Sequence, residues 1–145
     1  MRIRTLGREL FFKFLYSSDV SGKRSGDDFE PFAADQEPSA EARAFARDLV
    51  LGALPKADAL ITSLESVSPN WTWRRMPAVD RNILLAGIYE LLCIDDVHPT
   101  VTINEYVDIA KRYGSATSGA FVNGVLDAVR KQLAPKKGAK PAARE

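Results

Sequence analysis

The sequence predicts an all-α protein, a compact bundle of about six to seven helices, from three observations. Apolar residues recur three or four positions apart along most of the 145-residue chain, and no segment alternates as a half-buried strand does. The segments between these periodic stretches are short and rich in turn-forming residues. Apolar residues make up 46% of the chain, as in an ordinary globular domain. We assign residues 1–134 to one helical domain and the apolar-poor residues 135–145 to a disordered basic tail.

The first predicted helix covers about residues 5–19, where Leu10 and Phe14 lie one turn apart on the side that faces the core. Residues 21–38 are rich in Gly, Ser, Pro and acidic side chains and show no apolar period. They predict an exposed acidic loop. Ser39 follows as the N-cap of a second helix.

Prolines divide the middle of the chain. Pro55 and Pro77 predict the starts of a third and a fourth helix, because proline suits the first turn of a helix but not its interior. Residues 68–75 between them form a turn-rich connector. From Ile83 to Cys93 the fourth helix is apolar on more than one side, so we expect it to be the buried centre of the bundle.

Two further helices complete the prediction. Thr102 and Glu105 have the spacing of a capping box, in which each side chain satisfies a free backbone N–H of the other. We therefore expect the fifth helix to begin at this pair, and Gly114 to end it. The last helix runs over about residues 117–133.

Cysteine and histidine are too scarce for most catalytic or metal chemistry. The single Cys93 and single His98 exclude a disulfide framework, a zinc site and a Cys–His dyad. We expect no metal, no cofactor and no enzymatic activity. The lack of disulfides and of a long apolar run points to a reduced, cytoplasmic setting.

The total charge of +1 conceals a polarised sequence, since residues 1–24 carry a net charge of +4 and residues 27–48 a net charge of −5. Four residues of the first helix recur at four-residue steps: Arg4, Arg8, Phe12 and Tyr16. Guanidinium groups pair with phosphates and aromatic faces stack on unpaired bases, so this line has the composition of a single-stranded nucleic-acid contact. A solvated charged face with its aromatic rings in the core is the alternative.

A few other residues also allow two interpretations. Trp71 and Trp73 either close one end of the bundle or stack on bases, and Tyr113 and Phe121 either face a ligand or belong to the core. Gly124 lies inside a helix, where glycine costs about 1 kcal/mol relative to alanine. This position indicates a close approach between helices or a backbone contact to a ligand.

Four blocks stand in a specific order in the second half of the chain: VDRNILLAGIYEL at 79–91, PTVTINE at 99–105, AKRYG at 110–114 and FVNGVLD at 121–127. In order and spacing they resemble the NusB family of transcription antitermination factors. Upstream, Trp71 with Arg75, and Arg8 with Tyr16, fit the same pattern. The resemblance covers roughly residues 4–130.

The resemblance implies a bundle of two helical subdomains that binds boxA-type single-stranded RNA of a nascent ribosomal transcript. The implied protein partner is NusE, ribosomal protein S10, and through it the RNA polymerase elongation complex. Asp80 matches a position that faces NusE. The RNA-binding residues that the resemblance implies are Arg2, Arg4, Arg8, Tyr16, Tyr113 and Phe121. The four-residue line of the first helix adds Phe12. The arginine cluster is sparser than is usual in the family, and Lys111, with Lys13 and Arg112, is a candidate to compensate.

Two other functions stay open. A NusB-like domain also precedes the catalytic domain of certain ribosomal-RNA cytosine methyltransferases, although these 145 residues contain neither a Gly-rich cofactor loop nor a catalytic cysteine motif. The second open function is that of a purely structural helical adaptor, or of a homodimer that covers the RNA face.

Overall fold

The computed structural model describes residues 2–67 and 70–134, so the predicted tail and residues 68–69 of the predicted connector lie outside the described residues. Within these ranges the regular elements are all helical, which confirms the predicted fold class. The α-helices are α1 (Arg2–Ser21), α2 (Phe29–Gln36), α3 (Ala40–Ala53), α4 (Ala57–Ser66), α5 (Ala78–Cys93), α6 (Pro99–Tyr113) and α7 (Ser118–Gln132). Short 3-10 turns are η1 (Gly26–Asp28), η2 (Leu54–Lys56) and η3 (Trp73–Arg75).

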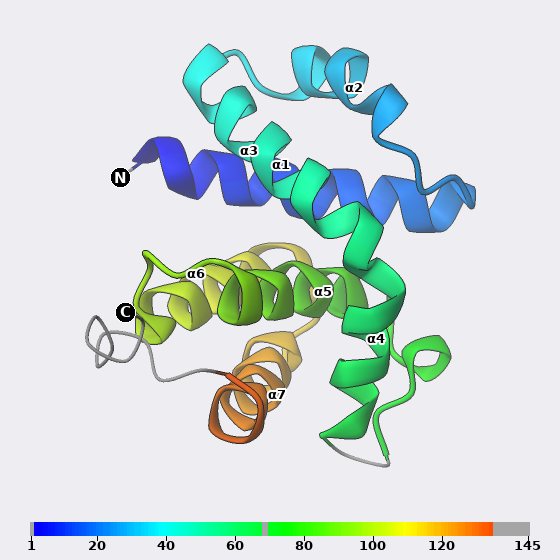
Figure 1. Cartoon of the computed structure of the whole chain (residues 1–145), viewed down its shortest axis with the longest axis vertical. Coiled ribbons are helices and arrows are strands. Elements are labelled where there is room, and N and C mark those ends of the chain that lie inside the picture. The colour runs from blue at the N-terminus through cyan, green and yellow to red at the C-terminus, as the bar shows by residue number, and fades with distance from the viewer. Residues whose placement is uncertain (1, 68–69, 135–145) are drawn as a thin grey trace, which may run out of the picture.

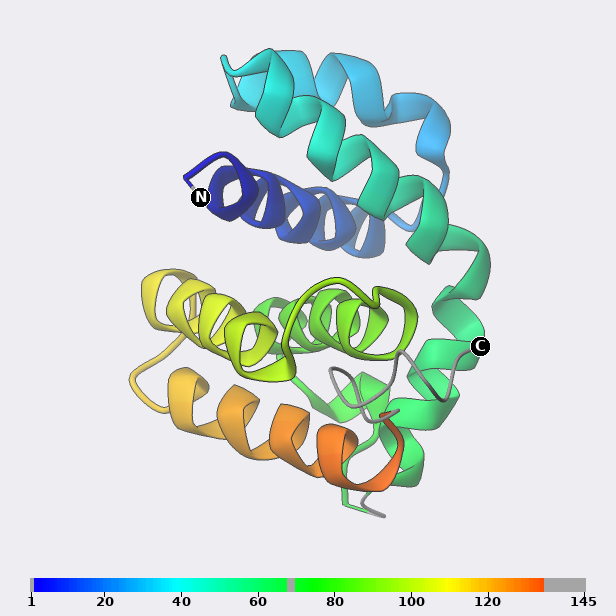
Figure 2. The same cartoon turned by 60° about the vertical axis from the view of Figure 1, so that its left-hand side comes forward.

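The helices form two halves. Helices α1, α2 and α3 make one half and α5, α6 and α7 the other, as Figure 1 shows. Helix α1 packs against α3 on one side and against α5 and α6 on the other (Figure 2). Helix α3 continues through η2 into α4, which runs down beside α5 and joins the two halves.

Helix α5 is the buried centre, as its apolar sequence predicts. Every residue from Asn82 to Leu91 is buried. A Cβ at Gly87 would lie 2.8 Å from the Leu126 side chain, so the absence of a side chain lets α7 approach α5 directly.

The prediction of a loop throughout residues 21–38 was wrong, because part of this segment forms α2. The rings of Phe29 and Phe32 pack edge-on against Phe14 of α1 at centroid distances of 5.3 and 5.5 Å, and Ala33 is completely buried. These three apolar residues are enough to hold two turns of helix on α1, although acidic residues outnumber them.

The predicted capping box was also wrong. Helix α6 begins one turn earlier, at Pro99, and the Nδ1 atom of His98 caps it by accepting a hydrogen bond from the Thr100 backbone N–H at 3.1 Å. Thr102 is therefore buried inside the helix, and Glu105 is available for contacts with α1. The predicted end of this helix at Gly114 is confirmed.

Candidate nucleic-acid interface

Arg8 does not face solvent. Its side chain is 3% exposed, and its Nε atom donates to both carboxylate oxygens of Glu90 on α5, at 3.1 and 2.9 Å. Its Nη1 atom donates to Glu105 of α6 at 3.2 Å. The prediction that Arg8 contacts RNA was wrong, because this guanidinium is part of an internal ion-pair network.

This network joins α1 to the other half of the molecule. Glu90 also accepts a short hydrogen bond from the Tyr106 hydroxyl, and Glu105 accepts one from Thr5 at 2.9 Å. Burial alone would lower the pKa of Arg8, but the hydrogen bond and the charge of Glu90 outweigh it and raise that pKa. Burial, and then Glu90, raise the pKa of Tyr106 well above its usual value.

The four-residue line on α1 does not form one surface. Because a helix turns 100° per residue, each step of four rotates the line by about 40°. Arg4, whose side chain is 49% exposed, lies beside Asp96 (3.8 Å) and the Phe45 ring (5.3 Å). Tyr16, at the other end of the line, packs towards Tyr113. Arg2 is exposed at the start of α1.

The structure does bring together a group of aromatic and basic residues where α1 meets the end of α6. The ring of Phe12 lies between Tyr16 and Tyr113, at centroid distances of 6.2 and 5.7 Å, and the Nζ atom of Lys13 lies 5.4 Å from the Tyr113 ring. We call Phe12, Lys13, Tyr16 and Tyr113 the tyrosine cluster. They line a shallow pocket of about 330 Å³.

Only the outer members of the tyrosine cluster are accessible. Tyr16 and Tyr113 are 36% and 37% exposed, whereas Phe12 is buried beneath them. The prediction of Phe12 as a contact residue was therefore wrong, because its ring supports the two tyrosines from below. The accessible rings and the Lys13 ammonium are suited to stack on bases and to pair with a phosphate.

Glu9 organises the α6 side of this surface. Its carboxylate accepts a hydrogen bond of 2.8 Å from the Tyr113 hydroxyl and pairs with Arg112, whose pKa it raises. The sequence analysis missed this role. No local pattern marks it, since Glu9 and Arg112 are 103 positions apart.

Phe121 and Asp80 lie in a different place from the tyrosine cluster. Both line a second pocket of about 670 Å³, together with Trp71, whose ring meets Phe121 edge-on at 6.2 Å. Asp80 is 7% exposed and accepts a hydrogen bond of 2.7 Å from the Ser118 hydroxyl. It lies in the first turn of α5, where a negative charge stabilises the helix. The small exposed part of its side chain lines the pocket, so a partner that enters the pocket can reach it.

Three other candidate residues, Trp71, Trp73 and Lys111, pack against other parts of the chain. Trp73 lies between the guanidiniums of Arg24 and Arg81, at 5.7 and 5.3 Å. Trp73 and Trp71 both pack against the core, which favours the closing role over base stacking. Lys111 extends from α6 over the start of α7, on the other side of α6 from Tyr113.

Among residues 2–67 and 70–134, no group of three or more His, Cys, Asp or Glu side chains could hold a metal ion. No helix in the same ranges is both long and apolar enough to cross a membrane.

Comparison with known proteins matches the chain to one family. Residues 5–131 match the family model described as the NusB family. A transcription antitermination protein NusB of Geobacter sulfurreducens is 42% identical over 139 residues, which cover 95% of this chain and all of the relative. One from Syntrophus aciditrophicus is 38% identical, covering 94% of this chain and 84% of the relative.

Solved structures agree with the sequence matches. NusB of T. maritima superposes with a TM-score of 0.81 at 33% identity, covering 92% of this chain and 94% of that one. A chain in a crystal structure of the antitermination factors NusB and NusE in complex with dsRNA superposes with a TM-score of 0.82 at 30% identity. That match covers 90% of this chain and 98% of the other.

Proposed function

This chain belongs to the NusB family, and we propose that it acts in transcription antitermination by binding boxA-type single-stranded RNA together with NusE. Its relatives are named for this process, and one solved relative is seen with both NusE and RNA. This is a binding role and involves no reaction. It places the protein in the cytoplasm, at the RNA polymerase elongation complex.

The observation that carries the RNA assignment is the tyrosine cluster. Tyr16 and Tyr113 are exposed and each packs against the buried Phe12 ring, with Lys13 near the Tyr113 ring and Arg112 next in sequence to Tyr113. Stacking on aromatic rings selects unpaired bases, while phosphate contacts supply affinity that depends on salt. Arg2 and Arg4 remain proposed as additional phosphate contacts, because both are exposed.

The NusE assignment rests on Asp80 and the pocket that it lines, and Phe121, which the sequence predicts as an RNA contact, lines the same pocket. It is open to solvent, combines apolar rings with a carboxylate, and lies beyond the α6–α7 turn from the tyrosine cluster. A partner that enters this pocket can contact Asp80 without contacting the tyrosines. We expect Asp80→Asn to weaken NusE binding in calorimetry and to leave RNA binding by the chain alone unchanged.

Fluorescence anisotropy with a boxA RNA tests the RNA assignment. Tyr16→Ala should weaken binding about tenfold, since a stacked base is worth about 1–3 kcal/mol. Lys13→Ala should reduce the slope of log K against log salt by about 0.7. Tyr113→Phe keeps the ring and should bind as the wild type does.

Lys56→Ala is the matched control for charge, because Lys56 is exposed on η2, outside the tyrosine cluster. Equal affinities for Tyr16→Ala, Lys13→Ala and Lys56→Ala would remove the tyrosine cluster from the RNA site.

A further inference from the structure

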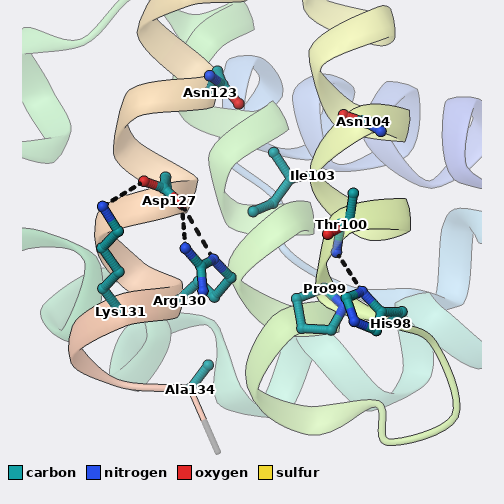
Figure 3. Close-up of a pocket in the computed structure, with 10 residues that line it drawn as sticks. All are labelled: His98, Pro99, Thr100, Ile103, Asn104, Asn123, Asp127, Arg130, Lys131 and Ala134. Carbon is teal, nitrogen blue, oxygen red and sulfur yellow. Dashed lines mark hydrogen bonds and ion pairs between the residues drawn. The ribbon is translucent and has the colours of Figure 1, made fainter. Parts of the chain in front are cut away.

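A second surface lies between α6 and α7 and is used by none of the contacts proposed above. It is an open groove of about 600 Å³, shown in Figure 3. Its walls come from the start and middle of α6 and from the second half of α7. The lining residues are His98, Pro99, Thr100, Ile103, Asn104, Asn123, Asp127, Arg130, Lys131 and Ala134.

Two exposed asparagines stand on opposite walls of this groove, Asn104 on α6 and Asn123 on α7 (Figure 3). Neither side-chain amide is hydrogen-bonded to any part of the chain that the structure describes. Each offers one acceptor and two donors to a ligand. The next residue, Gly124, is exposed, and apart from its own helix backbone and chain neighbours no described atom lies within 4 Å of the position of a Cβ, so close packing against another helix does not explain this glycine.

The charges at one end of the groove favour an anion. Arg130 and Lys131 approach Asp127 at 2.8 and 3.1 Å, and Asp127 is the one carboxylate among the described lining residues. The Lys131 side chain is 65% exposed, so it keeps donors free for a ligand.

The seam between α6 and α7 leads from this groove towards the C-terminal end of α6. Lys111 lies in the seam, because a Cβ at Gly119 would be 3.0 Å from its Cγ atom. Thr100 and Lys111 are eleven residues apart on α6, which is about 16 Å along the helix. Tyr113 of the tyrosine cluster follows two residues later, on the opposite side of α6, so an RNA that contacts both surfaces has to pass around the end of this helix.

We propose that the α6–α7 groove binds a second stretch of the same single-stranded RNA, outside the stretch that contacts the tyrosine cluster. This inference rests on the proposed function. Lys111, Arg130 and Lys131 contact phosphates, while Asn104 and Asn123 donate to and accept from base edges or 2′-hydroxyls. The groove has no Phe, Tyr or Trp among its described lining residues, so it adds affinity that depends on RNA length more than on sequence.

Anisotropy with RNAs of different length tests the proposal. One probe is a boxA core, and two others extend it by about eight nucleotides of mixed sequence at the 5′ or the 3′ end, within the usual footprint of a single-strand groove. Wild-type protein should bind one extended RNA more tightly than the core. The double variant Asn104→Ala/Asn123→Ala should weaken binding of that extended RNA about fivefold, at about one hydrogen bond's worth of free energy, and leave the core unaffected.

Lys131→Ala should lower the salt slope for the extended RNA by about 0.7 and leave the slope for the core unchanged. Gln132→Ala is the matched control, because Gln132 is exposed on the same helix and does not line the groove. Helical circular dichroism checks that each variant is folded.

The outcomes separate this inference from the proposed function. If the wild type binds the core and gains nothing from either extension, or if the double variant keeps the gain, the groove is not an RNA site and the tyrosine cluster is unaffected. If the double variant instead loses affinity for NusE, the groove binds protein, and the assignment of the groove to RNA is overturned. If the wild type binds none of the RNAs, the proposed function itself fails.

Discussion

Arg8 offers a direct test of whether an arginine of α1 acts in folding or in RNA binding. We consider Arg8→Met, which keeps much of the side-chain volume and removes the charge. The substitution removes the guanidinium that pairs with the buried Glu90 carboxylate at 2.9 Å and that lies 5.5 Å from the Phe45 ring. Tyr106 still donates to Glu90, but a neutral hydroxyl does not compensate a buried charge.

The expected destabilisation follows from burial. Breaking a buried ion pair by removing one partner costs about 3–5 kcal/mol. This is a large part of the roughly 5–15 kcal/mol that stabilise a domain. For a chain of this length it corresponds to a fall in Tm of roughly 10 °C. Arg4→Met is the matched control on the same helix, and it should cost less than about 0.5 kcal/mol because the Arg4–Asp96 pair is exposed.

Urea unfolding followed by circular dichroism measures both variants, and an unchanged m-value supports a two-state comparison. Adding Glu90→Gln to Arg8→Met should recover part of the loss, because the buried negative charge that Arg8 balances is then gone as well. At a temperature where it is folded, Arg8→Met should bind boxA RNA as the wild type does. The reasoning is refuted if Arg8→Met is no less stable than Arg4→Met, or if it loses RNA affinity while it remains folded and stable.

Three further predictions concern stability. Gly124→Ala should raise the free energy of unfolding by about 0.5–1 kcal/mol in urea, since the site is open and helical; a loss of stability would show a contact that the structure lacks. Gly7→Ala should lower it by about 1–3 kcal/mol, because a Cβ there would lie 2.5 Å from the Phe45 ring, and an unchanged midpoint would contradict this packing. The pKa of Asp19 is lowered by hydrogen bonds from Arg81 and Asn82, which outweigh its burial. The stability that Asp19 contributes is therefore present above the pKa of the unfolded chain, about 4, and is lost as the pH falls through the lower folded pKa. Asp19→Asn should flatten this acid limb of a stability–pH profile, and an unaltered acid limb would exclude the effect.

Most helix positions could be predicted from the sequence, because the signals for them are local. Pro77 and Gly114 lie at the ends of α5 and α6, and Ser39 caps α3 by accepting from the Ala42 backbone N–H at 3.1 Å. The two errors came from segments where local signals compete. A capping-box spacing at Thr102 concealed the true start at Pro99, and acidic residues around Phe29 concealed α2.

The candidate site was less predictable. Tyr16, Tyr113 and Lys13 were recognised from composition and from the family resemblance, and the structure places them together. Arg8 and Phe12 were assigned to the same surface, but both are buried. A spacing of four residues puts side chains near one another on a helix, and it does not say which of them another helix will cover.

The amino-acid sequence alone determined the all-α class, the boundaries of most helices and the family, since each depends on periodicity, capping residues or motif order along the chain. The tertiary structure alone decided which charged residues belong to the surface. Arg4 and Arg8 are one helical turn apart and chemically identical, yet Glu90, 82 positions away, holds only Arg8 inside. Burying a guanidinium requires a carboxylate at the same point in space, and that coincidence exists only after α1 has packed on α5.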